Sequence, residues 1–287
     1  MEIDLAFQYL KKKIIARGGN CVGYKDDFLR RRLEGRMRLK GLATYAEYAH
    51  FLDKNPSEFN DLLDALTINV SEFFRDVTVW DTLRKQILPP MIKEKLAKDR
   101  RELRAWSAGC ADGEETYTIA LLVLEALAYL SNSFKIEVLG TDVDPPSLNR
   151  ARNGDYATAR LRLVNDQILR RYFTPGIKDR FTVVDAVKKL VTFKPHDLFT
   201  PPPASGFDLI TCRNVIIYFS KEQQQQLYRN FYDALRAGGY LILGKVESIV
   251  GESTSLFTCT DLAERIYKKP LQPNLPATAS VIPNVRR

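Results

Sequence analysis

The first 75 residues show apolar side chains at helical spacing. Apolar residues recur every three or four positions from Ile3 to Ile14, a period that predicts an amphipathic helix. Three similar stretches begin near residues 26, 44 and 55, and the second of them opens on Thr44 and Glu47, a capping-box pair. Because no alternating strand pattern occurs here, residues 1–75 are predicted to form a small all-α N-terminal domain.

Residues 76–100 are predicted to connect this domain to the rest of the chain. The segment from Trp80 to Leu96 has a helical apolar pattern. Pro89 and Pro90 lie inside it. Because proline lacks a backbone N–H and clashes with the preceding turn, the pair is predicted to interrupt the helix.

From Arg101 the pattern changes to strands that alternate with helices. Apolar runs predict strands at 103–107, 136–141, 207–212 and 240–244, and helical patterns occur at 114–130, 146–153 and 221–236. This alternation predicts an α/β, Rossmann-like domain with a mostly parallel sheet covered by helices on both faces. Residues 257–269 are predicted to form a final strand, antiparallel to 241–248, so that the domain spans 101–269.

Two stretches depart from this alternation. Residues 170–196 contain three short β-like runs around turn signals, at 171–173, 181–184 and 190–193. They are predicted to form a small antiparallel β-subdomain inserted in the larger domain. Residues 270–287 are rich in proline and show no apolar period, so this tail is predicted to be disordered.

The stretch 103–120 combines a strand, a turn of small residues and a helix. A nucleotide-like cofactor can approach the backbone closely at such a turn. The GxGxxG spacing of dinucleotide enzymes is missing, which disfavours a nicotinamide dehydrogenase, and the helix opens with Glu114 and Glu115. Two carboxylates would repel a pyrophosphate, but they suit a ligand that carries positive charge. S-adenosylmethionine, with its ammonium and sulfonium groups, is such a ligand.

A further acid supports a cofactor site. Asp142 follows the predicted strand 136–141, where a carboxylate can accept hydrogen bonds from ribose hydroxyls. Taken singly, Glu114 and Glu115 are ordinary first-turn acids that complement the helix dipole. The combination of strand, small turn and acids favours the cofactor.

A polar group of residues lies at the predicted domain junction. Asn69, Ser71 and Arg75 belong to the stretch NVSEFFRD, and pockets often form between domains. Arg75 offers a planar fork that matches a carboxylate. The alternative is a structural salt bridge across the junction.

Another polar group follows the predicted strand 207–212. Arg213, Asn214 and Tyr218 come where the strand ends, and ligands of doubly wound sheets bind beyond the carboxyl ends of strands. The alternatives are that Asn214 caps the next element and that Tyr218 is part of the core.

The 287-residue chain is basic, with a formal net charge of +8 and an isoelectric point of about 9.2. Basic proteins often bind polyanions, so nucleic acid, an anionic membrane surface and an acidic protein are candidate partners. In residues 25–40, Arg30, Arg32, Arg36 and Lys40 project away from the apolar seam. This face is predicted to dock an acidic partner, the alternative being a merely solvated surface. The lack of interleaved aromatic residues disfavours single-stranded nucleic acid.

Other compositional features narrow the class of protein. No apolar run approaches the roughly 20 residues needed to span a membrane, and the N-terminal charges are in the wrong order for a secretory signal. The four cysteines are scattered without metal-site spacing, and only two histidines occur. We therefore expect a cytoplasmic protein without a metal centre.

Five motifs together resemble the chemotaxis receptor methyltransferases, the CheR family. They are NVSEFFRD (69–76), WSAGCADGEETYTIA (106–120), LGTDVD (139–144), PHDLF (195–199) and ITCRNVIIYF (210–219). Their order and spacing match that family over roughly residues 5–268. The resemblance implies an S-adenosylmethionine-dependent enzyme that methylates glutamate side chains on the cytoplasmic helical domain of chemoreceptors. It also implies a helical N-terminal domain, a Rossmann-like domain and an inserted β-subdomain, which in some relatives docks a receptor peptide.

The resemblance also implies which residues form the site. The cofactor is expected to be bound by Asn69, Ser71, Arg75, Ala108, Glu114, Asp142, Asp197, Leu198, Arg213 and Asn214. Arg75 and Tyr218 are expected to face the transfer centre. The chain departs from the family at Asp197, where asparagine is common, and at GKVES (244–248), where GHSE is common.

The implied chemistry suits this composition. A glutamate carboxylate has a pKa near 4.3, so it is ionised at neutral pH and needs no general base. The enzyme's task is then positioning and charge complementarity, and S-adenosylhomocysteine is the cofactor product. Two alternatives stay open: an RNA methyltransferase, suggested by the basic charge, and a non-catalytic adaptor that binds S-adenosylmethionine. The intact motif residues disfavour the adaptor.

Overall fold

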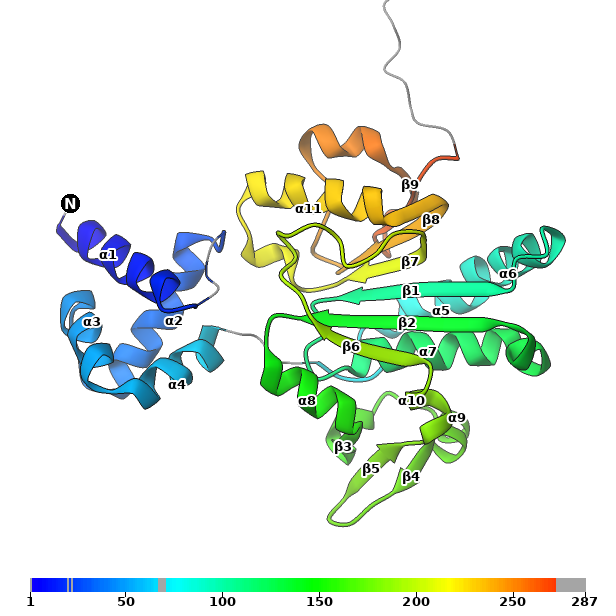
Figure 1. Cartoon of the computed structure of the whole chain (residues 1–287), viewed down its shortest axis with the longest axis horizontal. Coiled ribbons are helices and arrows are strands. Elements are labelled where there is room, and N and C mark those ends of the chain that lie inside the picture. Colours follow the sequence, from blue (N-terminus) through cyan, green and yellow to red (C-terminus); the bar gives the residue numbers. More distant parts are fainter. Residues whose placement is uncertain (1, 20, 22, 67–70, 272–287) are drawn as a thin grey trace, which may run out of the picture.

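The computed structural model describes residues 2–19, 21, 23–66 and 71–271 (Figure 1). Within them, the N-terminal domain consists of α1 (Glu2–Ala16), α2 (Asp26–Leu39), α3 (Tyr45–Lys54) and α4 (Pro56–Leu66). Their apolar faces share one core, built around Phe7, Leu33 and Leu62. At the start of α3, Thr44 Oγ1 accepts the Glu47 N–H at 3.1 Å and the Glu47 carboxylate accepts the Thr44 N–H at 2.9 Å. The four helices and the capping box predicted from the sequence are confirmed.

The connecting segment is helical throughout. It comprises α5 (Val77–Thr82), a π-helical turn (Leu83–Ile87) and α6 (Leu88–Ala97). Pro89 and Pro90 lie in the first turn of α6, and the Leu88 N–H donates to the Leu83 carbonyl, five residues back. The predicted interruption is therefore a widened turn, because prolines need no intrahelical acceptor in a first turn.

The main sheet has seven strands in the order β6-β2-β1-β7-β8-β10-β9. The strands are β1 (Glu102–Ala108), β2 (Lys135–Asp142), β6 (Val191–Pro195), β7 (Phe207–Cys212), β8 (Leu235–Leu243), β9 (Thr258–Asp261) and β10 (Ile266–Lys268). The strands from β6 to β8 pair in parallel, whereas β10 pairs antiparallel with both β8 and β9. The predicted final strand is thus two strands joined by a turn.

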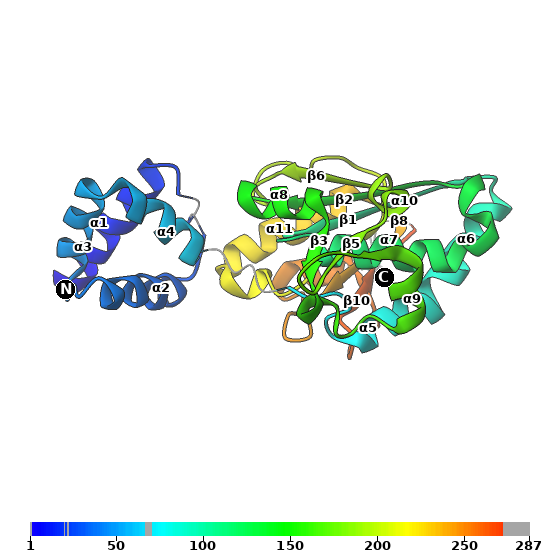
Figure 2. The ribbon, with the colours of Figure 1, turned by 90° about the horizontal axis from the view of Figure 1, so that it is seen from below.

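Helices cover both faces of this sheet (Figures 1 and 2). Successive residues of a strand point to opposite faces, so Leu209 packs in one core and Ile210 in another. The first core contains residues of α5, α6, α7 (Glu114–Leu127) and α8 (Pro145–Asn153), and the second contains residues of α11 (Lys221–Ala234). The predicted α/β class, with a mostly parallel sheet between two helical layers, is confirmed.

The inserted β-subdomain begins earlier than the sequence suggested. It contains an antiparallel sheet of β3 (Asp155–Ala157), β5 (Arg180–Val183) and β4 (Phe173–Pro175), in that order. The third predicted run, 190–193, was wrongly assigned, because it overlaps β6, which pairs in parallel with β2. We use the name β-subdomain for residues 155–188, which also include the 3-10 helix Thr158–Leu161, α9 (Asp166–Tyr172) and α10 (Asp185–Lys188).

The N-terminal domain contacts the main domain through the segment after β7. Tyr24 forms a β-bridge with Phe219, and their rings stack with centroids 5.3 Å apart. The Lys25 N–H donates to the Tyr218 carbonyl at 2.8 Å. The predicted tail falls largely on residues 272–287, outside the described part. Among the helices of the described residues, none combines the length and apolarity needed to cross a membrane.

Candidate active site

A cavity lies at the carboxyl ends of β1 and β7. Its lining comes from the 71–80 segment, the turn after β1, the start of α7 and the loop after β7: Ser71, Glu72, Arg75, Trp80, Gly109, Cys110, Ala111, Glu115, Arg213, Asn214, Val215 and Tyr218. In the sheet, β1 has β2 and then β6 on one side, and β7 and then β8 on the other, so the strand order reverses its direction next to β1. Ligands of α/β sheets bind at such a switch in strand order.

The turn after β1 depends on glycine. Gly109 has φ +78°, and a Cβ there would meet Val215 Cγ2 at 2.7 Å. The N–H groups of Gly109 and Cys110 both donate to the Thr141 carbonyl, at 2.8 and 2.9 Å. The turn is therefore fastened to the end of β2 and closely packed against the loop after β7, and only a residue without a side chain fits at its start.

Glu115, rather than Glu114, reaches the cavity. One Glu115 oxygen accepts hydrogen bonds from Ser107 Oγ at 2.9 Å and from Thr211 Oγ1, and the other accepts from Arg213 at 3.2 Å. Glu114 is fully buried and does not line the cavity. Because neighbouring helix residues point about 100° apart, only one of the pair can face the ligand side. Both Glu114 oxygens are buried without a hydrogen-bond partner among the described residues, and its role in binding the cofactor stays a prediction.

Glu114 faces the β-subdomain instead. Its Oε1 lies 3.2 Å from an Arg160 Nη1. Burial raises the pKa of Glu114 to about 7, although Arg160 and hydrogen bonds act to lower it. Glu114 is therefore a group whose charge changes near neutral pH beside Ser71, which lines the cavity.

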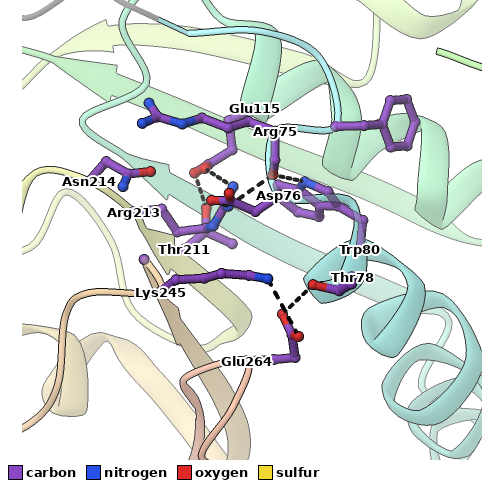
Figure 3. A network of polar contacts seen from close by, with 12 residues as sticks. Arg75, Asp76, Thr78, Trp80, Glu115, Thr211, Arg213, Asn214, Lys245 and Glu264 are labelled. Carbon is purple, nitrogen blue, oxygen red and sulfur yellow. Dashed lines mark hydrogen bonds and ion pairs between the residues drawn. The ribbon is translucent and has the colours of Figure 1, made fainter. Parts of the chain in front are cut away.

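Arg213 ties three parts of the site together (Figure 3). Its Nη2 donates to the Arg75 carbonyl at 2.9 Å and to Asp76 Oδ2 at 2.7 Å, while its Nη1 donates to Glu115. The guanidinium stacks 4.8 Å from the Trp80 ring, and the side chain is only 2 % exposed. Protein groups occupy both terminal nitrogens, whereas the buried Nε has no hydrogen-bond partner in the described part of the chain. Arg213 therefore holds Glu115 and the 75–76 backbone in place through its two terminal nitrogens.

Arg75 and Tyr218 both line this cavity. The Arg75 carbonyl accepts the Trp80 indole N–H at 2.8 Å, and its neighbours Phe74 and Asp76 have φ values of 57° and 58°. Figure 3 shows the Arg75 side chain extending to the side where Asn214 lies. Non-glycine residues rarely adopt positive φ, and such strain concentrates at functional sites.

Tyr218 lies between the two domains. Its ring contacts Phe28 of α2 with centroids 4.8 Å apart. Burial raises the pKa of the Tyr218 hydroxyl, whereas Arg32 and Arg75 act to lower it. The phenol is thus protonated at neutral pH and lies in a positive field supplied from both domains.

The other predicted cofactor residues lie outside this cavity, at neighbouring strand ends. Asp142 is the last residue of β2, and Asp197 comes shortly after the end of β6. These two strands pair with each other. Asp142 accepts the N–H of Ala111 at 2.8 Å, and burial raises its pKa. Ala108 ends β1, and Leu198 follows Asp197; both are buried. Asn69 falls outside the described residues.

Glu247, within the GKVES stretch, is a site residue that was not predicted from the sequence. Its buried carboxylate accepts five backbone N–H groups, from Gly244 at 2.6 Å, Asn214 at 3.0 Å, Val215 at 2.9 Å, Ile216 at 2.8 Å and Ile217 at 3.2 Å. This carboxylate fixes the conformation of the loop that leads from Arg213 to Tyr218. The stretch lacks the histidine common in the family, and its glutamate holds the loop that carries Asn214 and Tyr218.

The predicted docking face on α2 is only partly free. Arg36 donates to both oxygens of Glu58, at 2.9 and 2.7 Å, and Lys40 lies 2.8 Å from the same carboxylate. Arg30 pairs with Asp4 and stacks over Phe7. Arg32 lies over the Phe28 ring. Arg30, Arg36 and Lys40 thus already form ion pairs within the domain, and the docking role of this face stays a prediction.

Comparison with known proteins agrees with this architecture. Residues 6–67 match the family model described as "CheR methyltransferase, all-alpha domain", and residues 69–266 match "CheR methyltransferase, SAM binding domain". Similar proteins include the chemotaxis protein methyltransferase of Listeria innocua, 35% identical over 86% of this chain and 92% of that protein. Those of Borreliella burgdorferi and Escherichia coli are 34% and 31% identical, over 82% and 85% of this chain and 84% and 85% of their own lengths. Since the two matched domains account for nearly all of the described residues, the chain belongs to the CheR methyltransferase family.

Proposed function

We propose that this protein transfers a methyl group from S-adenosylmethionine to glutamate carboxylates of chemoreceptors, giving methyl esters and S-adenosylhomocysteine. The observation that carries the proposal is that opposite charges line one cavity. The acid Glu115, the cation Arg75 and the phenol of Tyr218 all belong to its lining. A site with this polarity suits a cationic cofactor beside an anionic acceptor.

The residues present fit S-adenosylmethionine. Among the described residues, Glu115 Oε2 accepts only the Arg213 donor and so can also accept from an ammonium group. The glycine turn at Gly109 leaves room for close approach. Asp142 would accept hydrogen bonds from ribose hydroxyls. Asp197 and Leu198, one strand further along, would border the base. When bound, the cofactor supplies a methyl group made electrophilic by the sulfonium.

The remaining expected residues take supporting parts in this proposal. Ser71 and Asn214 line the cavity and offer polar groups to the cofactor, and Ala108 supplies the small end of β1. Asn69 belongs to the same proposed set. Arg213 acts through Glu115 and Arg75, which it fixes by hydrogen bonds.

The acceptor carboxylate would bind Arg75, whose planar fork matches two oxygens. Tyr218 would donate a hydrogen bond that orients the same group, since its hydroxyl stays protonated. Glutamate is already ionised at neutral pH, so no residue has to remove a proton. Arg75 and Tyr218 therefore align the acceptor oxygen and exclude water.

The proposed partner is the cytoplasmic helical domain of a chemoreceptor. Positive charge near Tyr218 comes from Arg32 as well as Arg75, which favours an acidic surface near the acceptor. A receptor peptide on the β-subdomain is a second proposed contact. An RNA substrate is less favoured, because two acids, Glu72 and Glu115, also line the cavity.

The first experiment is a calorimetric titration with S-adenosylhomocysteine. We expect saturable micromolar binding to the wild-type protein and its loss in Asp142→Ala. If the folded protein binds no S-adenosylhomocysteine, the proposed methyltransferase activity is contradicted. A non-catalytic adaptor that does not use this cofactor would then be the better interpretation.

The second experiment follows labelled methyl groups into chemoreceptor membranes. We expect alkali-labile methyl esters on receptor glutamates, and an Arg75→Ala variant slower by roughly a hundredfold, as for the loss of a charge-stabilising donor. Arg84→Ala is the control, because Arg84 is exposed and outside the cavity. Wild-type rates in Arg75→Ala would overturn the role of Arg75, and labelling of RNA instead of receptor would favour the RNA methyltransferase.

A further inference from the structure

The 71–76 segment carries Arg75 but has no regular structure of its own. It forms neither helix nor strand, and Phe74 and Asp76 adopt positive φ. Regular elements hold their residues by repeated backbone hydrogen bonds, which this segment lacks. Its position must therefore be fixed by contacts from elsewhere in the fold.

The β-subdomain supplies several of these contacts through one residue. The Phe73 N–H donates to the Arg160 carbonyl at 3.1 Å, and the Arg160 guanidinium donates to the Ser71 carbonyl. Arg160 lies in the 3-10 helix directly after β3. Its main chain and side chain thus hold two alternate residues of the segment that leads to Arg75.

The neighbouring side chains support this attachment. The Phe73 ring is packed edge-on against Tyr156 at 4.9 Å and Phe173 at 5.2 Å. Arg162 donates to both oxygens of Glu72 at 2.7 and 3.0 Å. The segment is therefore docked on the β-subdomain along several consecutive residues.

The same guanidinium also reaches the start of α7 and the turn before it. Arg160 Nη1 lies 3.2 Å from Glu114 Oε1, and its Nη2 lies 3.8 Å from Asp112 Oδ2. Glu114 is fully buried at the start of α7, one residue before the cavity acid Glu115. A buried carboxylate needs a compensating charge, so Arg160 connects the 71–76 segment to the turn that carries Glu115.

We propose that Arg160 is a positioning residue for methyl transfer. It holds the Ser71–Arg75 segment against Glu114 and so sets the distance between Arg75 and the cavity wall that carries Glu115. This proposal rests on the proposed function for its catalytic consequence. Misplacement of a positioned group by about 1 Å can lower a rate by roughly a hundredfold.

The test compares Arg160→Met with Arg160→Lys and with a matched control. Methionine keeps an unbranched stem of similar reach but removes every donor. Arg84→Met is the control, because Arg84 forms an exposed ion pair with Asp81 at 3.2 Å, outside both the cavity and the β-subdomain. Amide hydrogen exchange of residues 71–76 and steady-state methyl transfer are measured for each protein.

In Arg160→Met, we expect exchange at 71–76 to accelerate by about tenfold or more and kcat to fall by about tenfold or more. Arg160→Lys should restore part of the slow exchange and part of kcat, because it keeps the positive charge. The recovery should be incomplete, because one ammonium cannot reproduce the planar fork between the Ser71 carbonyl and Glu114. Arg84→Met should match the wild type in both measurements.

The proposal is overturned if a folded Arg160→Met keeps wild-type exchange at 71–76, or if its exchange rises while kcat is unchanged. If Arg160→Met does not fold, Arg160→Lys decides: wild-type exchange and kcat overturn the proposal, and a partial loss of both supports it. A wild-type protein that methylates no receptor would overturn the proposed function. The exchange data would still show whether Arg160 holds the segment.

Discussion

The Glu247 carboxylate accepts the backbone N–H of Asn214 at 3.0 Å, although 33 positions separate the two residues. Asn214 has φ +60°, a backbone conformation that non-glycine residues rarely adopt. Glu247 also accepts the N–H groups of the three residues after Asn214. One buried carboxylate therefore stabilises a strained turn and, through it, the placement of Tyr218.

Glu247→Gln should destabilise the protein by about 3 kcal/mol or more, because an amide replaces an acceptor that serves several buried N–H groups. The glutamine side-chain nitrogen is itself a donor, so it cannot accept the backbone N–H groups that point at it. Chemical denaturation measures the change in the free energy of unfolding. Glu252→Gln is the control, since Glu252 is exposed and pairs only with Arg229 at the surface. Equal unfolding free energies for Glu247→Gln and the wild type would contradict this account of the loop.

Glu115→Gln should weaken binding of S-adenosylhomocysteine by about tenfold or more, because a charge-assisted hydrogen bond to the ammonium group becomes a neutral one. Calorimetric titration provides the dissociation constant. The Ser107 and Thr211 hydroxyls can still donate to the glutamine oxygen, so the fold should persist. Glu252→Gln again serves as the control. An unchanged dissociation constant for Glu115→Gln would show that this acid does not contact the cofactor.

Glu114 should make the stability of the protein depend on pH. Its pKa is raised to about 7 by burial, from about 4.3 in the unfolded chain. Between about pH 4.3 and pH 7 the carboxyl group of Glu114 is protonated in the folded state and ionised in the unfolded chain. The contribution of Glu114 to stability is therefore complete below about pH 4 and is lost as pH rises through 7. Asp112, Arg160, Ser71 and Tyr156 face this carboxyl group.

The corresponding variant is Glu114→Gln. The wild type should lose roughly 3 kcal/mol of stability relative to Glu114→Gln between pH 5 and pH 8. Denaturation curves of both proteins at several pH values measure this difference. Parallel pH profiles for the two proteins would show that Glu114 does not titrate in this range.

Arg36→Ala should act on stability rather than on docking. Burial acts to raise the pKa of Glu58, but hydrogen bonds from Arg36 and Lys40 lower that pKa to about 2. Removing Arg36 leaves this buried carboxylate short of its main partner, at a cost of about 3 kcal/mol. Denaturation of Arg36→Ala measures the loss. Arg38→Ala, on the same helix and exposed, is the control, and equal stability of the two variants would contradict the assignment.

The sequence by itself determined the elements and the edge at which the site forms. Apolar periods of three to four residues specified the N-terminal helices, and strands alternating with helices specified a parallel sheet. The carboxyl ends of parallel strands gather at one edge, so residues following β1 and β7, such as Glu115 and Arg213, had to lie near one another. The motifs of the chain were informative because they mark these strand ends.

The tertiary structure alone decided which of these residues face the cavity. The rotation of α7 about its axis depends on packing against the sheet, and it directs Glu115 to the cavity and Glu114 toward Arg160. Glu247 acts on Asn214 across 33 positions. Local spacing sets a period, whereas partners distant along the chain are brought together by the packing of whole elements. For this reason, hydrogen bonds between distant residues could not be predicted from any one stretch of sequence.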